Sequence, residues 1–513
     1  MSDFDFAILG SGFASSLCAA ILAKNGRSVV VLDRGKHPRF AIGESTTPAA
    51  DFLLHHLAIQ YGLSELIPLT RYGSWTDQYP DIRCGCKRGF SYVWHGDGSQ
   101  YAATADHKNE LMVTANASRE VADTQWYRPD VDSFFLKVAK SYGVNVIEEA
   151  VIEEVDSDEN GCHQLTCVIQ GERRSIRSPF VIDGSGPNSV FMKRFGGADL
   201  THHLVTNTSA VYGHFIGGQV TENWLVKRNA AVSDFPYPFD QAAVHHLFDD
   251  GWLWQIGFDG GITSLGFVTN ATRKREHLKE KGNSGFFASD SREFAFKEWE
   301  SRMNCHPILR ALYGDCRCAD FPGRLFHVPR IQRLREKAAG ENWASLSFTI
   351  GFIDPLHSTG IAHTLSTVER VCDIVLQNNI EKRKSDLQAY SSRVIDEFLH
   401  IDKIIATCYA CLYDFDLFSA ATMIYFSAAI ALERHRGLNL ETGFLLSRDE
   451  RFCQIVEHVN RKAERLDERS SRSERHATED LIKEIQTLLQ PYNDVGLFTP
   501  TIRNMILHTT AAK

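Results

Sequence analysis

The chain has 513 residues, a length typical of about two to four structural units. Hydrophobic residues make up 43% and charged residues 23%, which is the balance of an ordinary soluble globular protein. The net charge of -9 argues against a nucleic-acid partner, because nucleic-acid-binding proteins usually carry a basic excess.

The sequence favours a cytoplasmic location. Asp3 and Asp5 stand where a secretory signal would be basic, so the apolar run at the N-terminus is better explained as a strand. The twelve cysteines are scattered, and reduced thiols are favoured over metal binding at the C-x-C pairs 84/86 and 316/318. Residues 417–432 are apolar but shorter than a membrane span, so we expect a buried helix, with membrane contact as the minor alternative.

The N-terminal segment predicts a strand, a tight turn, a helix and a second strand. Residues 4–9 form an apolar run, residues 14–25 have the pattern of a helix, and residues 27–32 form another apolar run that ends at Asp33. This order is the opening of a doubly wound α/β sheet.

The turn in this segment has the sequence Gly-Ser-Gly-Phe-Ala-Ser at positions 10–15, with Ser15 where a third glycine is usual. Glycines let the backbone approach a pyrophosphate, and the helix that follows offers its free N–H groups. Asp33 lies 23 residues after Gly10, close to the spacing of an acid that binds the ribose. The segment therefore predicts a dinucleotide-binding site.

The rest of the chain divides into three patterns. Residues 129–142 predict a helix, residues 144–148 a strand, and residues 165–170 and 175–183 two strands of a meander that returns to the sheet. Short β-like runs between about 200 and 326 predict an antiparallel sheet that covers a substrate; they are 210–216, 243–248, 251–258 and 264–268. Residues 344–352 predict a further strand. A helix is expected from Ile361, and the chain beyond about Ser366 is expected to be helical to its end, with a charged, solvated face at 460–485.

Two loops attract attention as binding elements. Residues 43–48, Gly-Glu-Ser-Thr-Thr-Pro, allow two compatible interpretations: Ser45 or Thr46 caps a helix that begins near Pro48, or the loop contacts a bound cofactor. Residues 351–360 lead from a strand through a glycine-bearing turn to a helix start, where backbone N–H groups favour an anion.

Two further motifs have a simple structural interpretation and a functional one. Residues 251–257, Gly-Trp-Leu-Trp-Gln-Ile-Gly, place two tryptophans on one face of a strand, as a core strand also does. Lys87 stands beside Arg88 in Cys-Gly-Cys-Lys-Arg-Gly-Phe-Ser at 84–91, and a surface lysine is the simple interpretation. Strand alternation predicts one face with Lys87, Gly89 and Ser91 and another with Arg88, Phe90 and Tyr92.

The loops at 10–15, 43–48 and 351–360 together resemble the FAD-binding fold of the flavin-dependent aromatic hydroxylases and halogenases, and residues 183–186 resemble the second nucleotide-proximal segment of that fold. The tryptophan motif and the lysine strand make the resemblance to the halogenases more specific, in particular to those that act on phenols, although Gly257 replaces the usual proline. The resemblance covers about the first 370 residues.

The resemblance implies an α/β fold (α+β overall) that combines a doubly wound FAD-binding fold of the aromatic-hydroxylase type with an antiparallel substrate sheet and a C-terminal helical region. The implied divisions are an FAD-binding domain at 1–199 with a return segment at 330–375, a substrate-covering region at 200–329 and a helical region at 376–513.

The resemblance also implies a set of functional residues and no metal. Lys87 is the catalytic residue, and Trp252, Trp254 and Ile256 keep the substrate away from the flavin. The halide is bound at Ser358, Thr359 and Gly360. FAD is contacted by Gly10, Gly12, Phe13, Ala14, Ser15, Asp33, Arg34, Ser45, Thr46, Arg128, Asp183, Asp354, Gly360 and Ile361.

The implied reaction is the FADH2- and O2-dependent chlorination or bromination of an electron-rich aromatic substrate, by way of hypohalous acid. Tryptophan halogenases carry glutamate where this chain has His357, which points away from free tryptophan and towards a phenol, free or carrier-protein-bound. The base is not identified; the candidates are Glu44, Glu110, His95 and His357.

The resemblance also implies a partner protein and leaves two alternative functions open. A second dinucleotide fold is not visible, so a separate NAD(P)H-dependent flavin reductase is expected to supply reduced flavin to a monomer or homodimer. The alternatives are a flavin-dependent aromatic monooxygenase and a flavin-binding relative without catalysis.

Overall fold

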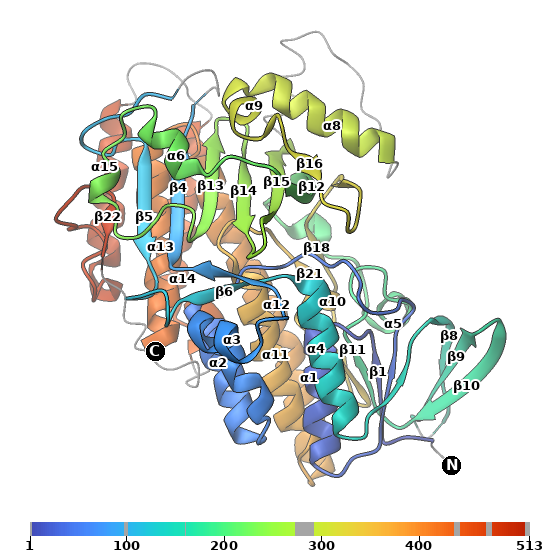
Figure 1. The fold of residues 1–513 in the computed structure, drawn as a ribbon. Helices are drawn as coiled ribbons and strands as arrows, with labels where there is room; N and C mark the ends of the chain where they lie inside the picture. The colour runs from blue at the N-terminus through green and yellow to red at the C-terminus, as the bar shows by residue number, and fades with distance from the viewer. Residues whose placement is uncertain are drawn as a thin grey trace.

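The computed structural model describes residues 3–96, 101–159, 161–271, 292–434, 442–467 and 475–507. Figure 1 shows two main sheets: a parallel sheet flanked by helices in the lower half, and a larger sheet above it. The orange and red C-terminal helices run behind the larger sheet and continue down to the parallel one. The arrangement confirms the predicted α/β class with a helical C-terminal region.

The parallel sheet has the strand order β19-β20-β11-β1-β2-β7. The strands from β20 to β7 are parallel, and β19 joins β20 in the antiparallel sense. Every residue of β1 and β2 is buried, which explains why both were continuous apolar runs in the sequence. The strands are β1 (Phe6–Leu9), β2 (Val29–Leu32), β7 (Asn145–Ile147), β11 (Val181–Asp183), β19 (Ala339–Gly340) and β20 (Trp343–Ser345).

Helices cover one face of this sheet, and a three-stranded meander with one short helix packs against the other. Helix α1 packs against α4 and α11, and its alanine-rich sequence allows the close approach. A meander of three strands, β8 (Ala150–Ser157), β9 (His163–Ile169) and β10 (Glu172–Ser178), extends to one side. The prediction of a single strand over 175–183 was wrong, because β10 ends in this small sheet before β11 begins in the large one. The helices are α1 (Phe13–Lys24), α2 (Pro48–Gln60), α3 (Tyr72–Gln78), α4 (Arg128–Ser141) and α5 (Val190–Phe195), and the 3-10 turn is Ser64–Thr70.

The second sheet has nine strands in the order β16-β12-β15-β14-β13-β4-β5-β22, with β17 also paired to β12. The four predicted strands are its centre and are antiparallel, as expected. That β4 would join β13, in the parallel sense, was not predicted. The strands are β4 (Gly89–Trp94), β5 (Glu110–Thr114), β12 (Thr208–Ile216), β13 (Ala243–Phe248), β14 (Gly251–Gly257), β15 (Ile262–Asn270), β16 (Arg317–Cys318), β17 (Phe326–Val328) and β22 (Met505–Ile506).

Smaller elements join the two halves. Two-stranded sheets pair β3 (Cys84–Lys87) with β6 (Asp123–Trp126) and β18 (Arg333–Leu334) with β21 (Gly351–Phe352). Helices α6 (Thr221–Val226), α8 (Arg292–Cys305) and α9 (Pro307–Tyr313) lie at the edge of the nine-stranded sheet. The predicted strand over 344–352 was wrong: β20 ends at Ser345, α10 (Ser347–Ile350) makes one helical turn, and only then does β21 follow.

The C-terminal region consists of α11 (Thr359–Val375), α12 (Ile380–Ala410), α13 (Phe415–Arg434), α14 (Glu450–Asp467) and α15 (Arg475–Leu489). The chain is not helical to its end, because β22 returns to the nine-stranded sheet and pairs in parallel with β5. The charged stretch at 460–485 is solvated on one face only, since Ala463 and Ile485 are fully buried; residues 468–474 lie outside the described part.

Helix α13 is long and apolar enough to cross a membrane by length and composition alone. However, 89% of its most apolar window is buried inside the fold. Its aromatic side chains contact strand β4, for example Tyr425 and Phe426 against Phe90. The helix is thus part of the protein core, as predicted from the sequence.

Candidate active site

The turn between β1 and α1 depends on glycine. Gly10 has φ +84°, and a Cβ atom there would lie 2.6 Å from the backbone oxygen of Gly184. Gly12 is the N-cap of α1, and no side chain caps this helix end. The turns that follow β1 and β11 therefore lie against each other, at the carboxyl edge of the parallel sheet where α/β proteins bind nucleotides. The N-terminus of α1 faces that edge with its favourable potential for an anion.

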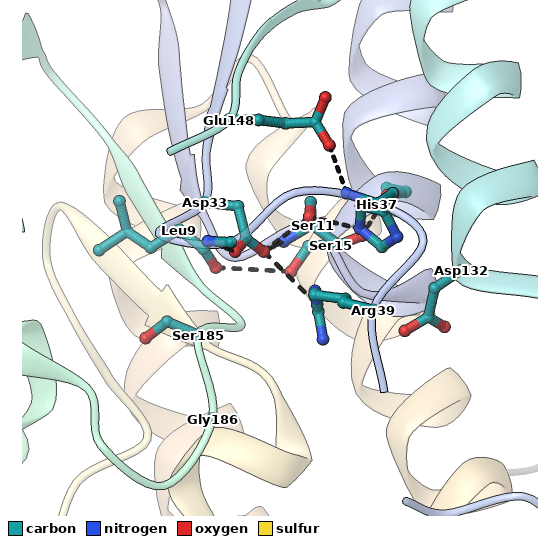
Figure 2. A network of polar contacts seen from close by, with 12 residues as sticks. Leu9, Ser11, Ser15, Asp33, His37, Arg39, Asp132, Glu148, Ser185 and Gly186 are labelled. Carbon is teal, nitrogen blue, oxygen red and sulfur yellow. Dashed lines mark hydrogen bonds and ion pairs between the residues drawn. The ribbon is translucent and has the colours of Figure 1, made fainter. Parts of the chain in front are cut away.

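Asp33 ends β2 and fixes the loop that follows it (Figure 2). Its carboxylate accepts hydrogen bonds from the backbone N–H and the hydroxyl of Ser11, at 2.7 and 2.6 Å, and from the backbone N–H of Gly35 at 2.7 Å. Burial works to raise the pKa of Asp33, but Arg39, 3.4 Å away, and these hydrogen bonds hold the pKa below its usual value. Asp33 is thus an ionised acceptor that shapes the nucleotide loop.

A cavity of about 490 Å³ begins at this turn and extends to β14 and the start of α11. Its volume falls in the range of roughly 300–1,000 Å³ that small-molecule sites occupy. Ten of the residues expected to contact FAD line it: Gly12, Phe13, Ala14, Ser15, Arg34, Ser45, Arg128, Asp354, Gly360 and Ile361. Gly10, Asp33, Thr46 and Asp183 do not line it. Asp183 instead accepts hydrogen bonds from Ser185 and Ser189, which hold the second turn.

Three arginines in the cavity wall suit an anionic cofactor. Within the described residues, Nε of Arg39, Nε of Arg330 and Nη1 of Arg333 are buried and have no hydrogen-bond partner. Burial lowers the pKa of Arg333 to about 10, which still leaves its guanidinium charged at neutral pH. Buried charged donors are costly unless an acceptor completes them, and the phosphates of a dinucleotide are such acceptors. The cavity therefore fits FAD.

These arginines were missed at the level of sequence. Arg39 belongs to the segment His-Pro-Arg-Phe that precedes the loop at 43–48, so its neighbourhood was a usable signal. Arg330 and Arg333 lie at the start of the return segment of the fold and carry no local motif. Only the pairing of β18 with β21 brings them to the cavity.

The loop at 43–48 is held by β6 and does not cap α2 with Ser45 or Thr46. Thr47 is the N-cap of α2 and makes no side-chain cap, while Pro48 is the first helical residue as expected. The hydroxyl of Thr46 donates to the backbone oxygen of Thr124 at 2.8 Å, and Ser45 bridges to Gln125. The capping interpretation was wrong, because β6 offers these residues partners that the helix end does not.

The start of α11 reaches the same cavity. Its N-cap, Ser358, has a left-handed backbone with φ 53° and makes no side-chain cap, while its hydroxyl donates to that of Ser45 at 3.1 Å. Ser358 and Gly360 line the cavity; Thr359 is buried but does not line it. Gly360 lies so close to Phe348 that a Cβ atom would be 2.9 Å from the ring. A 17-residue helix thus presents its N-terminus to the cavity, which favours an anion there.

The tryptophan motif forms one wall of the cavity. Trp252, Trp254 and Ile256 alternate along β14 and all line the cavity, so the expected shared face exists. Both indole N–H groups are fixed: Trp252 donates to the hydroxyl of Tyr409 at 2.8 Å and Trp254 to that of Ser264 at 3.1 Å. The two bulky side chains are therefore rigid, as a barrier requires.

Lys87 is fully buried and lies outside the lining of the cavity. Its Nζ donates to the backbone oxygen of Thr46 at 2.5 Å and lies 4.0 Å from the centre of the Phe90 ring. The predicted alternation across 87–92 was wrong, because β3 ends at Lys87 and β4 begins at Gly89, so Lys87 and Phe90 meet on one side. The buried Asp123 is its direct cross-strand partner. Carbonyl, ring face and carboxylate all suit an ammonium group.

Aromatic side chains surround this lysine and connect it to the cavity wall. His245 stacks on Trp252 and on Tyr92, with ring centres 4.9 and 4.5 Å apart, and itself lines the cavity. Burial, followed by the nearby Lys87, lowers the pKa of His245 to about 3, so its ring is neutral. Lys87 is thus separated from the cavity by a single layer of side chains.

Two polar atoms in this aromatic cluster lack partners within the described residues: the hydroxyl of Tyr92 and Nδ1 of His357. His357 stacks on Tyr425 at 4.3 Å, and its Nε2 lies 3.4 Å from Sγ of Cys408. Burial raises the pKa of Tyr92 well above its usual value, so its hydroxyl is neutral. His357 does not line the cavity, and burial holds its pKa well below the usual value.

The four candidate bases are separated by the structure. Glu110 contacts Tyr101 and His107, and His95 lies 3.0 Å from His246; none of these residues lines the cavity. Glu44 does line the cavity and forms a buried pair with His214, a residue that sequence reasoning missed because β12 carries no motif around it.

The fold and the cavity define a protein that binds a dinucleotide cofactor beside a rigid tryptophan wall and a helix start suited to an anion. A model of the tryptophan halogenase family matches residues 97–414, and a model of NAD(P)-binding Rossmann-like domains matches residues 8–82. The chain belongs to the tryptophan halogenase family. It is a flavin-dependent halogenase, an oxidoreductase that uses FAD.

Curated relatives agree over most of the chain. Monodechloroaminopyrrolnitrin halogenase PrnC of Pseudomonas fluorescens is 26% identical over 459 residues, which are 87% of this chain and 75% of the relative. Tetracycline 7-halogenase of Kitasatospora aureofaciens is 23% identical over 471 residues, 88% of this chain and 78% of the relative. The crystal structure of halogenase PltM in complex with phloroglucinol and FAD has a TM-score of 0.82 at 22% identity and covers 99% of this chain and all of its own, which shows a shared fold.

Proposed function

We propose that this halogenase chlorinates or brominates a phenolic substrate, and that Lys87 transfers the halogen from hypohalous acid to the aromatic ring. The observation that carries the proposal is the position of Lys87, fully buried between the flavin cavity and a cluster of aromatic side chains. A buried lysine is rare without a functional reason or a partner. Lys87 contacts the ring of Phe90, which stacks on His245 in the cavity wall.

The cavity side supports the oxidative half of the reaction. FAD, when bound and reduced, supplies the two electrons with which O2 oxidises a halide to the level of hypohalous acid. Ser358 and Gly360 at the start of α11 are proposed to hold the halide through backbone donors, with Thr359 behind them. Trp252, Trp254 and Ile256 keep the aromatic substrate out of this space and prevent its direct oxygenation.

The lysine side supports the transfer to the ring. Hypohalous acid is expected to pass the wall near His245 and to accept a hydrogen bond from the ammonium of Lys87, which is held by Thr46. Atoms balance when the substrate C–H and hypohalous acid give the C–halogen bond and water. The unpartnered atoms of Tyr92 and His357 are proposed to bind the phenolic hydroxyl group. A phenol also activates its own ring, so a histidine at position 357 suffices.

Names of related proteins support this choice without deciding it. PltM was crystallised with phloroglucinol, a polyhydroxylated benzene ring. Two relatives are a chlorinase and a brominase of 1H-pyrrole-2-carbonyl-[peptidyl-carrier protein], so a carrier-bound substrate is the alternative to a free phenol. Reduced flavin is expected from a separate NAD(P)H-dependent reductase, and a cytoplasmic monomer or homodimer is expected.

The test combines a substrate screen with two lysine variants. Purified enzyme, a flavin reductase, NADH and chloride or bromide are incubated with phloroglucinol, pyrrole-2-carboxylate and tryptophan, and products are read by mass spectrometry with a scavenger of free hypohalous acid present. Phenols are expected to gain halogen. Lys87→Ala and Lys87→Arg should lose halogenation but keep FAD binding and O2 consumption, because the guanidinium does not fit beside Thr46 and Phe90.

Lys297→Ala is the matched control, since that lysine is exposed and pairs only with Glu293 in the described structure. Full halogenation by Lys87→Ala would refute the role of the lysine. Oxygen instead of halogen in the wild-type product would favour the monooxygenase alternative, and preference for tryptophan would overturn the phenolic substrate.

A further inference from the structure

Glu44 and His214 form a fully buried pair at the cofactor cavity, with Glu44 lining the cavity and His214 behind it. Nε2 of His214 lies 2.6 Å from Oε1 of Glu44, and neither side chain is exposed to solvent. The second oxygen of Glu44 and Nδ1 of His214 are also buried, and neither has a hydrogen-bond partner among the described residues. A buried polar pair with an unpartnered atom on each side chain is costly unless a ligand completes it.

The pair lies at the end of the cavity where α11 begins. Glu44 lines the cavity, and the next residue, Ser45, accepts a hydrogen bond from Ser358, the N-cap of α11. The residue before it, Gly43, and the helix residue Gly360 both pack on the ring of Phe348. Glu44 is therefore adjacent to the backbone turn proposed to hold the halide.

The charged and titratable groups packed around Glu44 and His214 are already engaged or neutral. On the side of α4, Arg128 donates to the backbone oxygens of Ile42 and Gly43, but its guanidinium is already paired with Asp132 at 2.8 Å. Tyr127 lies 5.4 Å from the His214 ring, and burial raises its pKa, so its hydroxyl is neutral.

The remaining charged groups come from other elements. Arg39, in the loop after β2, contacts Asp33, and Arg333, next to β21, is charged. Asp354 faces the cavity from the loop before α11, and burial raises its pKa to about 7, but its carboxylate already accepts hydrogen bonds from Thr208 and Tyr409. The other contacts of His214 are the rings of Phe40 and Phe258.

The reaction needs one proton at this place. Reduced FAD, O2, one halide anion and one proton give oxidised FAD, hypohalous acid and one water, which balances atoms, charge and electrons. A halide beside the carboxylate of Glu44 would be repelled unless that proton is already present. One proton on the pair removes the repulsion and is then available when the oxygen–halogen bond forms.

We propose that Glu44 and His214 bind this proton together with the halide and release it as hypohalous acid forms. The idea rests on the proposed halide turn and on hypohalous acid as the product of the cavity. Both residues act on reacting atoms, Glu44 directly and His214 as the group that shares its proton.

The test measures halide binding at equilibrium, without turnover. The oxidised holoenzyme is titrated with bromide between pH 5 and 9, and binding is followed by quenching of flavin fluorescence. In the wild type, affinity for bromide is expected to fall as the pH rises, by up to about tenfold for each pH unit, because one proton binds with each halide. In Glu44→Gln and His214→Gln, affinity should vary less than about twofold over the same range.

Glu369→Gln is the matched control, because Glu369 is also a buried glutamate beside a histidine, 3.6 Å from His56, but does not line the cavity. It should keep the wild-type slope. Retention of bound FAD and of the melting temperature verifies that the variants fold. A pH-independent affinity in the wild type, no bromide binding at all, or an unchanged slope in Glu44→Gln overturns the inference. Halogenation of a phenol by the wild type is measured in a separate assay, and that assay tests the proposed function independently of this inference.

Discussion

The indole N–H of Trp252 donates to the hydroxyl of Tyr409 at 2.8 Å, which ties the tryptophan wall to helix α12. The same hydroxyl donates to the carboxylate of Asp354 at 3.0 Å, so the wall, the helix and the loop before α11 are one hydrogen-bonded unit. The proposed barrier between flavin and substrate is therefore held in place by a residue from the C-terminal helical region.

Tyr409→Phe tests this connection. The change leaves the indole N–H of Trp252 without its acceptor and one oxygen of Asp354 without its donor, at a cost of about 1–3 kcal/mol in the free energy of unfolding. Trp252 should then be free to rotate, and more substrate should be oxygenated or more peroxide released for each halogenated product. Product ratios by mass spectrometry and a peroxide assay measure this. Tyr237→Phe is the control, since its hydroxyl is also buried but binds the backbone oxygen of Phe90 on β4. Equal ratios in both variants would contradict the coupling.

Asp354 itself predicts a pH dependence of stability. Burial raises its pKa to about 7, against the opposing effect of hydrogen bonds from Thr208, Tyr409 and the backbone of Leu356. Because the folded protein binds this proton more tightly than the unfolded chain does, the stabilising contribution is complete below about pH 4 and is lost as the pH rises through about 7.

Asp354→Asn removes this titration. The difference in melting temperature between variant and wild type, measured without cofactor, should shift in favour of the variant between pH 4 and 8 and stay constant above that. Thermal unfolding monitored by circular dichroism provides the measurement. A difference that does not change with pH would mean that Asp354 stays ionised throughout.

Substitutions at two glycines of the same turn are expected to have different effects, one on stability and the other on FAD affinity. Gly10→Ala places a methyl group 2.6 Å from the oxygen of Gly184 in a left-handed backbone, so the apoprotein should lose several kcal/mol of stability, on the order of 2–4. Gly12→Val meets no atom closer than 3.6 Å from its first carbon, but it extends into the cavity. It should lower FAD affinity at least tenfold with little change in the melting temperature of the apoprotein. Wild-type FAD affinity in folded Gly12→Val would refute the cofactor site.

Short sequence patterns predicted those parts of the site that are built from residues close together in the sequence. The glycine turn, Asp33 at the end of β2 and the shared face of Trp252 and Trp254 follow from short patterns, and the structure contains all three geometries. Lys87 was identified by its motif, but its orientation was wrong because one residue between β3 and β4 breaks the alternation. Strand pairings over long sequence separation bring His214 to Glu44 in the cavity wall and Arg333 to the cavity itself, and no local pattern encodes such pairings.

The hydroxyl of Tyr92 offers the sharpest test of the substrate, because it is buried in the aromatic cluster and has no hydrogen-bond partner within the described residues. Removing it in Tyr92→Phe breaks no internal hydrogen bond, so the free energy of unfolding should stay the same or rise by up to ~1 kcal/mol. If the phenolic hydroxyl binds there, its loss should raise KM for phloroglucinol about fivefold, corresponding to ~1 kcal/mol, and leave FAD affinity unchanged. KM for an anisole analogue, whose ring oxygen cannot donate a hydrogen bond, should change less. Steady-state kinetics of halogenated product give both values. An unchanged KM for phloroglucinol together with unchanged stability would place the phenolic hydroxyl elsewhere in the cluster and leave Nδ1 of His357 as its partner.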